Sequence, residues 1–288
     1  GDEPRTRMFW PEGIGEWQSV KNSKQKFPEH NWPRKPLWGY VNEADPYVME
    51  MEIEAALDHG VNVFIYDWYW DMNGEDTGKF LHSALEKGFL KAKNRSRMKF
   101  GLMLCNHREL SRERWELLTD YVIENYFHLP EYWEVDGGKY FSLYELSTFV
   151  KGLGGMQQAA EAIESFRKKA AAKGYKLHIN FVEWGLQNEA LTGSDKNKAV
   201  EICKGDSVTS YVWIHNFVPK APLYAPYADW RDGAVPYWEK FRNTFSVEYY
   251  PNVSMGWDSS GRFDPQEEYV ADPNGGYYCT IMSENTPE

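Results

Sequence analysis

Carboxylates next to tryptophan or tyrosine recur along this chain of 288 residues, at positions where predicted strands end. The clearest case is Asp67, which follows the apolar run of residues 61–66 and precedes Trp68, Tyr69 and Trp70. Indole and phenol rings stack on the C–H faces of sugars, and a carboxylate accepts hydrogen bonds from hydroxyl groups or transfers a proton. This pattern predicts a sugar-binding site. The structural alternative is that Asp67 caps a turn and the rings belong to the core.

Four carboxylates are expected near strand ends and are the candidates for acid–base chemistry. Asp67, Glu183 and Asp258 are the catalytic candidates, Glu145 occupies the fourth such position, and the catalytic residue itself stays unassigned. Glycoside hydrolysis uses two carboxyl groups, about 5 to 5.5 Å apart for retention and about 6.5 to 9.5 Å apart for inversion. Instead of a catalytic role, Glu183 can serve as a helix cap or a surface acid. Asp258 can instead form an Asx turn with the serines that follow it.

The side chains expected to contact a sugar lie at or just after the same strand ends. Amides, imidazoles and indoles there can hydrogen-bond hydroxyl groups or stack on a ring without a metal ion. Trp68 and Trp257 are the leading ligand contacts, although some of the tryptophans can serve as packing instead. The predicted substrate-binding residues are Trp68, Tyr69, Trp70, Asn106, His107, Trp213, His215, Trp257, Asp258 and Arg262.

Other catalytic chemistries lack their sequence patterns. The histidines form neither HxH nor HExxH, and the phosphate-binding GxxxxGK[ST] loop and the GxSxG motif are absent. The glycines of residues 152–155 lack the GxGxxG pattern and predict a turn before a helix. No DxD-like pair lies near a strand end, which disfavours a metal-dependent sugar-nucleotide transferase. We therefore expect no metal and no cofactor.

Composition narrows the possible partners. The net charge of −11 argues against nucleic acid, whose phosphates require a basic surface. No apolar run approaches the roughly 18 residues that span a bilayer. The three cysteines, Cys105, Cys203 and Cys279, are sparse and odd in number, which predicts neither a disulfide framework nor a zinc site.

Strand and helix signals alternate along the chain, which is typical of parallel βα units. Asp45 and Pro46 predict the cap and first turn of a helix that ends before Gly60. A long Pro- and Trp-rich loop is expected over residues 11–44. Strands are predicted at residues 7–10, 61–66, 99–104, 140–144, 175–182, 207–213 and 247–254, and helices at 46–59, 77–90, 111–127, 156–173 and 236–243.

This alternation predicts an α/β fold, a (β/α)8 TIM-type barrel of which the chain supplies seven strands. A barrel of about 250 residues would occupy nearly the whole chain, whereas two domains of about 150 residues are the alternative. Because no linker interrupts the middle of the sequence, we predict a single barrel domain over residues 1–288. In such a barrel the candidate residues at the strand ends share the catalytic face.

Six segments, in order along nearly the whole chain, carry a family resemblance. They are residues 38–40, 64–70, 103–107, 152–155, 211–215 and 256–258, the last followed by Arg262. These segments resemble the bacterial proteins described as glycoside hydrolase family 99-like, also called WbsX-like. The resemblance implies a (β/α)8 barrel that acts on glycans, with endo-α-mannosidases as the best understood relatives.

The same resemblance implies a catalytic segment of the form Asn-Glu-Trp-x-Glu-Gly on the last strand, and the sequence contains none. Residues 285–288 resemble the start of the family's next helix, so we expect the C-terminal catalytic strand to be missing from this chain. The resemblance implies a carbohydrate-active protein, similar to the glycoside hydrolases that cleave α-mannoside-type linkages in polysaccharides. The alternative is a non-catalytic glycan-binding barrel or a truncated product. We further expect export to a bacterial periplasm or cell surface, and a homodimer that covers the open edges of the sheet.

Overall fold

The chain divides into two compact units. The computed structural model describes residues 4–30, 35–70, 79–186, 195–264, 266–272 and 280–286. Unit 1 consists mainly of residues 42–209 and 244–249, and unit 2 of residues 2–41, 210–243 and 250–288. Cys279 and the first residues of the predicted helix at 77–90 lie outside the described residues.

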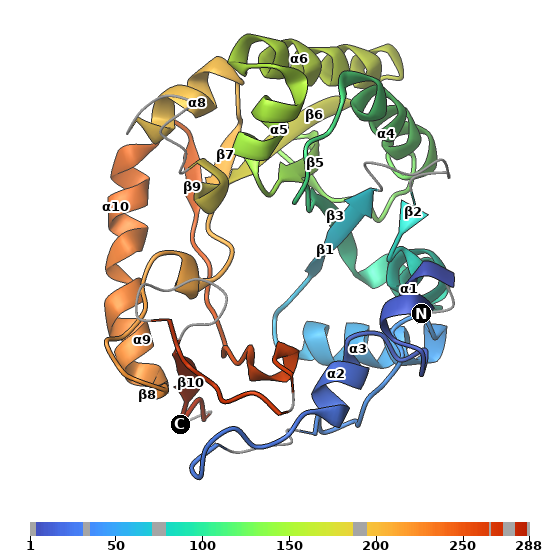
Figure 1. Cartoon of the computed structure of the whole chain (residues 1–288). Helices are drawn as coiled ribbons and strands as arrows, with labels where there is room; N and C mark the ends of the chain where they lie inside the picture. Colours follow the sequence, from blue (N-terminus) through green and yellow to red (C-terminus); the bar gives the residue numbers. More distant parts are fainter. Residues whose placement is uncertain are drawn as a thin grey trace. The chain divides into compact units, whose positions relative to one another are not determined.

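Unit 1 is built on a mostly parallel β-sheet (Figure 1). β1, β3, β5, β6 and β7 run parallel to their neighbours, whereas β2 is antiparallel to β1, and β4 (Glu134–Val135) is antiparallel to β5. This arrangement confirms the predicted α/β class. In the order in which they pair, the strands are β2 (Lys79–Phe80), β1 (Val63–Trp70), β3 (Lys99–Leu104), β5 (Gly138–Leu143), β6 (Lys176–Val182), β7 (Ser207–Thr209) and β9 (Glu248–Tyr250).

The helices of unit 1 begin and end with recognisable signals. The Asp45 side chain accepts a hydrogen bond from the backbone N–H of Tyr47 at 2.9 Å, as expected for the cap of α3 (Pro46–Asp58). Gly154 ends α5 (Leu146–Leu153) with a φ of 88°, a left-handed conformation that glycine adopts without strain. The other helices are η1 (Ala84–Gly88), η2 (Phe89–Lys91), η3 (Arg95–Arg97), α4 (Arg112–Asn125), α6 (Met156–Ala172), η4 (Glu183–Leu186) and α8 (Lys196–Ile202).

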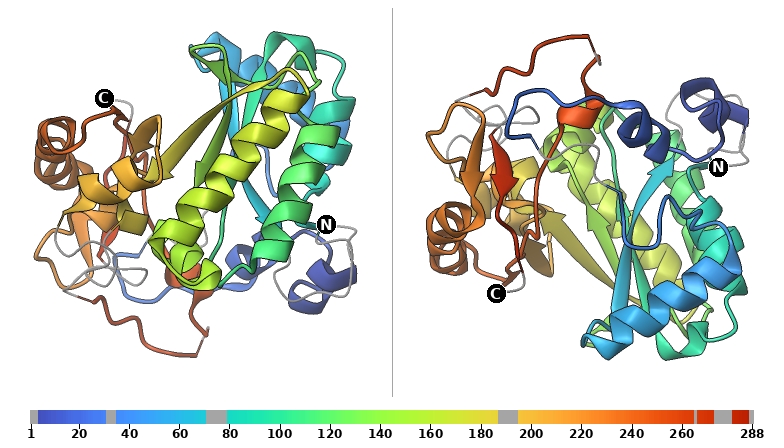
Figure 2. Two further views of the ribbon diagram at one scale, coloured as in Figure 1. Left: turned by 90° about the horizontal axis from the view of Figure 1, so that it is seen from above. Right: turned by 90° about the horizontal axis from the view of Figure 1, so that it is seen from below.

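The main core of unit 1 lies between the sheet and the helices, and Figure 2 shows α4 and α6 side by side across the strands. Trp115 of α4 is fully buried, packs edge-on against Phe149 and Phe166, and donates its indole N–H to the backbone oxygen of Ala162 at 2.9 Å. Burying each such ring contributes about 1.5 to 3 kcal/mol, so this contact anchors the helices to the sheet. The opposite face of the sheet carries Asp67 and Tyr69, which alternate with the buried Trp68 and Trp70 along β1.

Unit 2 has a smaller core around a two-stranded parallel sheet, in which β10 (Ile281–Ser283) pairs with β8 (Tyr224–Pro226). Its buried residues include Trp213, Trp230 and Met282. The remaining elements are α1 (Pro4–Phe9), α2 (Trp17–Asn22), η5 (Trp213–His215), α9 (Tyr227–Ala234), α10 (Pro236–Thr244) and η6 (Ser260–Arg262).

Three predicted elements differ in the structure. The strand predicted at residues 7–10 is wrong, because residues 4–9 form α1, for which a proline at the first position is well suited. The loop predicted over residues 11–44 contains the short helix α2. Instead of one regular helix at 77–90, β2 is followed by a π-helical turn that ends at Gly88. A Cβ atom at Gly88 would lie 1.9 Å from the backbone oxygen of Glu43, so this close approach accounts for the glycine there.

Candidate functional site

Asp67 lies within β1, where side chains alternate between the two faces of the sheet. Trp68 and Trp70 are buried among the side chains on the helical face, and Trp68 stacks on His82 at a ring-centroid distance of 4.8 Å. Asp67 and Tyr69 therefore face the opposite side, which we call the inner face. Trp68 is only 2% exposed, so the structure places this predicted sugar contact in the core.

A row of rings follows the carboxyl ends of the strands on the inner face. His107 lies 6.2 Å from Tyr69 and 5.2 Å from Tyr144 between ring centroids, and Tyr144 lies 5.4 Å from Trp184. Tyr69, Tyr144 and Trp184 also pack around Met103 and its neighbours in one apolar cluster. His107 is exposed and lines a pocket of about 420 Å³. The row thus brings Tyr69 and His107 together as predicted, with Tyr144 and Trp184 beside them.

Asp67 sets the electrostatics of this row. Burial raises the pKa of the Cys105 thiol, and the negative charge of Asp67 raises it further. Burial also raises the pKa of the Tyr144 hydroxyl, and the charges of Cys105, Asp67 and Glu145 add to this shift. Both groups therefore keep their protons at neutral pH, so the hydroxyl of Tyr144 is neutral close to a carboxylate.

Asn106 joins the ends of two neighbouring strands. Its side-chain oxygen accepts the backbone N–H of Glu145 at 3.0 Å, and its amide nitrogen donates to the backbone oxygen of Glu145 at 2.7 Å. Asn106 is fully buried, so the structure shows it holding the backbone of Glu145 in place. The Glu145 side chain is partly exposed at this end of the sheet.

Glu183 follows β6 and forms an ion pair with Lys196, the first residue of α8. The Glu183 side chain is completely buried, whereas that of Lys196 is 25% exposed. A buried carboxylate requires such a cation, because leaving it unpaired costs several kcal/mol. The sequence analysis missed Lys196, which is separated from Glu183 by a segment that includes residues outside the described part of the chain.

A buried polar chain crosses the inner face below the row of rings. Ser142 Oγ donates to Asn180 Oδ1 at 2.8 Å, and the Asn180 amide donates to Ser207 Oγ at 2.8 Å. His178 Nε2 lies 2.8 Å from the same Ser207 oxygen, and burial lowers the pKa of His178. These hydrogen bonds link β5, β6 and β7, so this part of the site has a fixed floor. The single polar residues inside apolar strands were its signal in the sequence.

Asp258 lies in unit 2, where it forms the Asx turn that was the structural alternative. Its Oδ1 accepts the backbone N–H of Ser260 at 2.9 Å and its hydroxyl at 2.5 Å, and its Oδ2 lies 3.0 Å from His30 Nε2. Burial alone would raise the pKa of Asp258, but the hydrogen bonds from His30 and Ser260 lower it below its usual value. Asp258 is thus an ionised group held by its neighbours.

His30, which the sequence analysis missed, completes this group without forming a catalytic triad. The backbone N–H of Lys26 donates to His30 Nδ1 at 3.2 Å, which assigns the ring proton to Nε2. Asp258 and Ser260 both face that same Nε2. A serine triad requires the serine and the carboxylate on different ring nitrogens, so this geometry does not activate the hydroxyl.

The other predicted binding residues of unit 2 have varied surroundings. Trp213 is buried and donates its indole N–H to the backbone oxygen of Asn252 at 3.1 Å, and Trp257 packs on the same core cluster. Burial lowers the pKa of His215 to about 4, so its ring is neutral. Arg262 pairs with Glu16. The predicted residues thus fall into one group in each unit.

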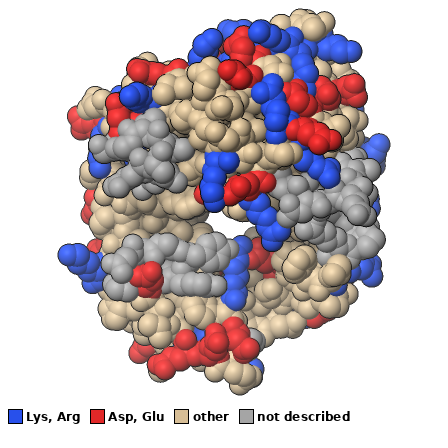
Figure 3. Space-filling model, turned by 45° about the horizontal axis from the view of Figure 1, so that its top comes forward, with Lys and Arg blue, Asp and Glu red and all other residues tan. Residues whose placement is uncertain are grey.

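Among the residues that the structure describes, no three His, Cys, Asp or Glu side chains are grouped as metal ligands. Cys105 and Cys203 are buried free thiols. None of the described helices combines the length and the apolar character that crossing a bilayer requires. On the face shown in Figure 3, acidic and basic side chains are interspersed.

A parallel sheet with carboxylates, amides and rings at the carboxyl ends of its strands defines an α/β protein with a candidate active-site edge. The family model "Glycosyltransferase WbsX" matches residues 3–286, and the chain belongs to this family. A search of curated proteins found no match.

Solved structures share the fold at low sequence identity. The GH99 endo-alpha-mannosidase from Bacteroides thetaiotaomicron matches with a TM-score of 0.50 and 13% identity, over 79% of this chain and 59% of that one. A GH99 endo-alpha-mannosidase structure in complex with BIS-TRIS-propane matches with a TM-score of 0.50 and 15% identity, over 79% of this chain and 62% of that one. A glycoside hydrolase-like protein gives a TM-score of 0.52 and 15% identity, over 91% of this chain and 82% of that chain. The chain thus spans about three fifths of the length of the two mannosidase structures.

Proposed function

We propose that this chain is a carbohydrate-active protein of the glycoside hydrolase type, and that its unit 1 binds α-mannoside-containing glycans at the inner face of the sheet. The observation that carries this proposal is the row of Tyr69, His107, Tyr144 and Trp184 beside the exposed carboxylate of Asp67. Rings provide platforms for the C–H faces of a sugar, while carboxylate, imidazole and phenol groups hydrogen-bond its hydroxyls.

Asp67 is the leading candidate for the group that contacts the reacting sugar. Of the three carboxylates at the strand ends of unit 1, it is exposed, Glu145 is partly exposed, and Glu183 is buried against Lys196. Asp67 and Glu145 are therefore the pair proposed to act on a glycosidic bond. Glu183 is proposed as a positioning residue that fixes the start of α8 below the site.

A turnover experiment tests this proposal and separates hydrolysis from transfer. The protein is incubated with α-linked mannotriose in H₂¹⁸O, and the products are analysed by mass spectrometry. Hydrolysis introduces one ¹⁸O atom into the new reducing end, whereas transfer to a second sugar produces a longer unlabelled oligosaccharide. Labelled product that disappears in Asp67→Asn supports the proposal, and unlabelled longer products would support a transferase.

A non-catalytic glycan-binding protein is the second candidate. It is favoured by the burial of Glu183 against Lys196, which leaves fewer exposed strand-end carboxylates for acid–base chemistry. Binding of mannotriose without turnover would support this candidate. Export to a bacterial periplasm or cell surface and association into a homodimer also belong to the proposal, and cell fractionation and sedimentation of the natural protein test them.

A further inference from the structure

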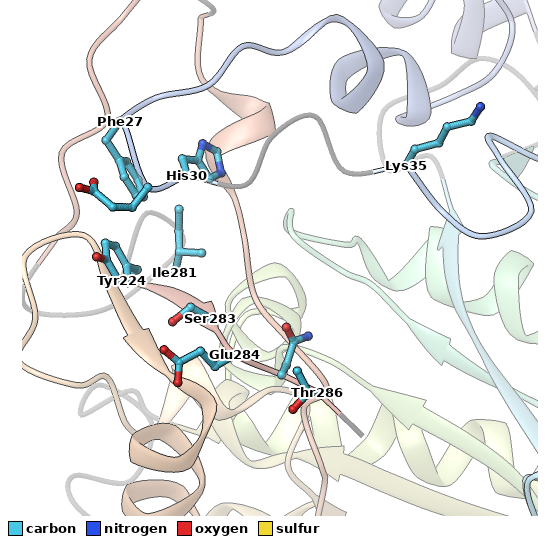
Figure 4. Close-up of a pocket in the computed structure, with 10 residues that line it drawn as sticks. Phe27, His30, Lys35, Tyr224, Ile281, Ser283, Glu284 and Thr286 are labelled. Carbon is cyan, nitrogen blue, oxygen red and sulfur yellow. The ribbon is translucent and has the colours of Figure 1, made fainter. Parts of the chain in front are cut away.

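Unit 2 contains a pocket of about 700 Å³ that the proposed function does not use (Figure 4). It is lined by Phe27, Glu29, His30 and Lys35, by Tyr224 of β8, and by Ile281 and Ser283 of β10 with residues 284–286 of the turn after it. Its volume lies within the range of about 300 to 1,000 Å³ that is usual for small-molecule sites. The pocket combines an aromatic wall with a polar one.

The aromatic wall is a stack of three rings. Phe27 lies between His30, at a centroid distance of 5.0 Å, and Tyr224, at 5.6 Å with an interplanar angle of 8°. Both nitrogens of His30 are hydrogen-bonded, one to the backbone of Lys26 and the other to Asp258, so the orientation of the His30 ring in the stack is fixed. Tyr224 is 41% exposed, which makes it the ring that a ligand can reach. A fixed flat ring suits the C–H face of a sugar.

The polar wall follows β10. Ser283 Oγ is buried and has no hydrogen-bond partner in the described part of the chain. Glu284, the next residue, has a φ of 55°, a left-handed conformation that is unfavourable for a residue with a side chain. Asn285 donates its amide N–H to the backbone oxygen of Met255 at 2.8 Å, which fixes its orientation. Figure 4 shows Ser283 and Glu284 one after the other at the end of β10, with Tyr224 on the neighbouring strand β8.

The charges of the lining select among ligands. Glu29 and Glu284 contribute two carboxylates to the lining, and Lys35, which lies apart from Glu284 in Figure 4, contributes an ammonium group. This balance disfavours phosphate, sulfate or uronic acid groups. Carboxylates accept hydrogen bonds from the hydroxyl groups of a neutral sugar.

From this combination we propose that the pocket is a second carbohydrate site, which binds a neutral saccharide between Tyr224 and the Ser283–Glu284 turn. The choice of a saccharide over another neutral polyol rests on the proposed function. The site holds a glycan independently of the inner face of unit 1, so that one chain contacts a polysaccharide at two places. Two linked contacts raise the overall affinity for a long glycan without any new interaction.

Calorimetric titration of the full chain with α-linked mannotriose tests this proposal in the Asp67→Asn background. Binding at the pocket should remain there, because Asp67 belongs to the other unit. Tyr224→Ala should weaken it about tenfold or more, because the platform is lost, whereas Tyr224→Phe should stay within about twofold. Glu284→Gln should weaken it by about threefold to tenfold, since a neutral amide accepts hydrogen bonds less strongly than a carboxylate. Tyr250→Ala removes a tyrosine of similar exposure outside the pocket and should change nothing.

Thermal melting of each variant confirms that the chain is folded. The proposal is overturned if Asp67→Asn abolishes all mannotriose binding, or if Tyr224→Ala binds as the parent does. It is also overturned if choline, a quaternary ammonium ion that aromatic rings bind, binds more tightly than the sugar. The two proposals fail separately. Binding lost only through Asp67→Asn supports the site in unit 1 and overturns the site in unit 2. Binding lost only through Tyr224→Ala supports the site in unit 2 and overturns the site in unit 1.

Discussion

Asp67 and Trp68 are adjacent in the sequence but point to opposite faces of β1, and this alternation decides which residues can meet a ligand. Because residues 61–66 are apolar at nearly every position, the run predicts a strand without indicating which side is open. The carboxylate was thus found from the sequence. Tyr144, whose hydroxyl is influenced by the charge of Asp67, and Trp184, which lies beside Tyr144, come from other parts of the chain, so their grouping required the fold.

Replacing Asp67 with Asn should reduce mannotriose turnover by about 100-fold or more, as expected for the loss of an acid–base group. The shape of the side chain is kept and the site is exposed, so the free energy of unfolding should change by less than about 0.5 kcal/mol. Initial rates and chemical denaturation measure the two effects. Glu124→Gln, an exposed change on α4, is the matched control, and an equal loss of activity in that variant would contradict the role of Asp67.

Replacing Lys196 with Met should destabilise the protein by about 3 to 5 kcal/mol, because it leaves the buried carboxylate of Glu183 without its cation. Glu183→Gln should cost less, since it removes the charge itself, and the double variant should recover part of the loss. Urea denaturation of the three variants measures these differences. Equal costs for the two single variants would show that the ion pair does not control the stability of this end of the sheet.

Glu52 makes stability depend on pH. Burial is the main reason that its pKa is raised to about 7, and the charge of Glu43 adds to the shift. Because the pKa in the folded state lies above that in the unfolded state, the stabilisation is fully present below about pH 4.5 and is lost as the pH rises through about 7.

Glu52→Gln should therefore be more stable than the parent at pH 8.5 by roughly 1 to 2 kcal/mol, a value that allows for the half-exposed carboxyl, and should differ little at pH 4.5. Denaturation curves at the two pH values test this expectation. Glu50→Gln, on the same helix, controls for the general loss of a carboxylate. A parent protein whose stability is flat between these pH values would contradict the raised pKa.

At the scale of elements, local signals fixed the starts of helices better than their interiors. Asp45, Pro46 and Ser111 were read correctly because caps act through neighbouring backbone groups. The irregular turns after β2 were not predicted. The glycine at their end, Gly88, is required by a close contact with the backbone of Glu43, which is distant in the sequence, so no local signal indicates it. Strands β7 and β9 are shorter than the strands predicted at 207–213 and 247–254, because strand pairing ends at Thr209 and at Tyr250.

Gly88→Ala should destabilise the protein by about 3 kcal/mol, because the new Cβ would lie 1.9 Å from the Glu43 backbone oxygen and the backbone must move. Lys87→Ala, the exposed neighbour, should stay within about 0.5 kcal/mol. Thermal denaturation of both variants provides the comparison. A Gly88→Ala protein as stable as the parent would show that the two segments do not pack this closely.

At the scale of the whole molecule, the predicted α/β class and family are confirmed, whereas the single domain over residues 1–288 stays a prediction. The candidate residues fall into two groups, with Asp67 and His107 in unit 1 and Asp258 and Arg262 in unit 2. Sequence spacing alone did not separate them, because both groups follow predicted strand ends. The proposed function needs only the first group.

The most direct test of the account is methyl NMR of the full chain labelled with ¹³C at methionine, titrated with α-linked mannotriose. Met103 lies under the ring row of the inner face, whereas Met98 is buried at the other end of β3 and serves as the internal reference. The account predicts a saturable shift of the Met103 methyl signal that Asp67→Asn reduces, with Met98 unchanged. A Met103 signal that stays fixed while mannotriose binds, or the absence of any binding, would contradict it.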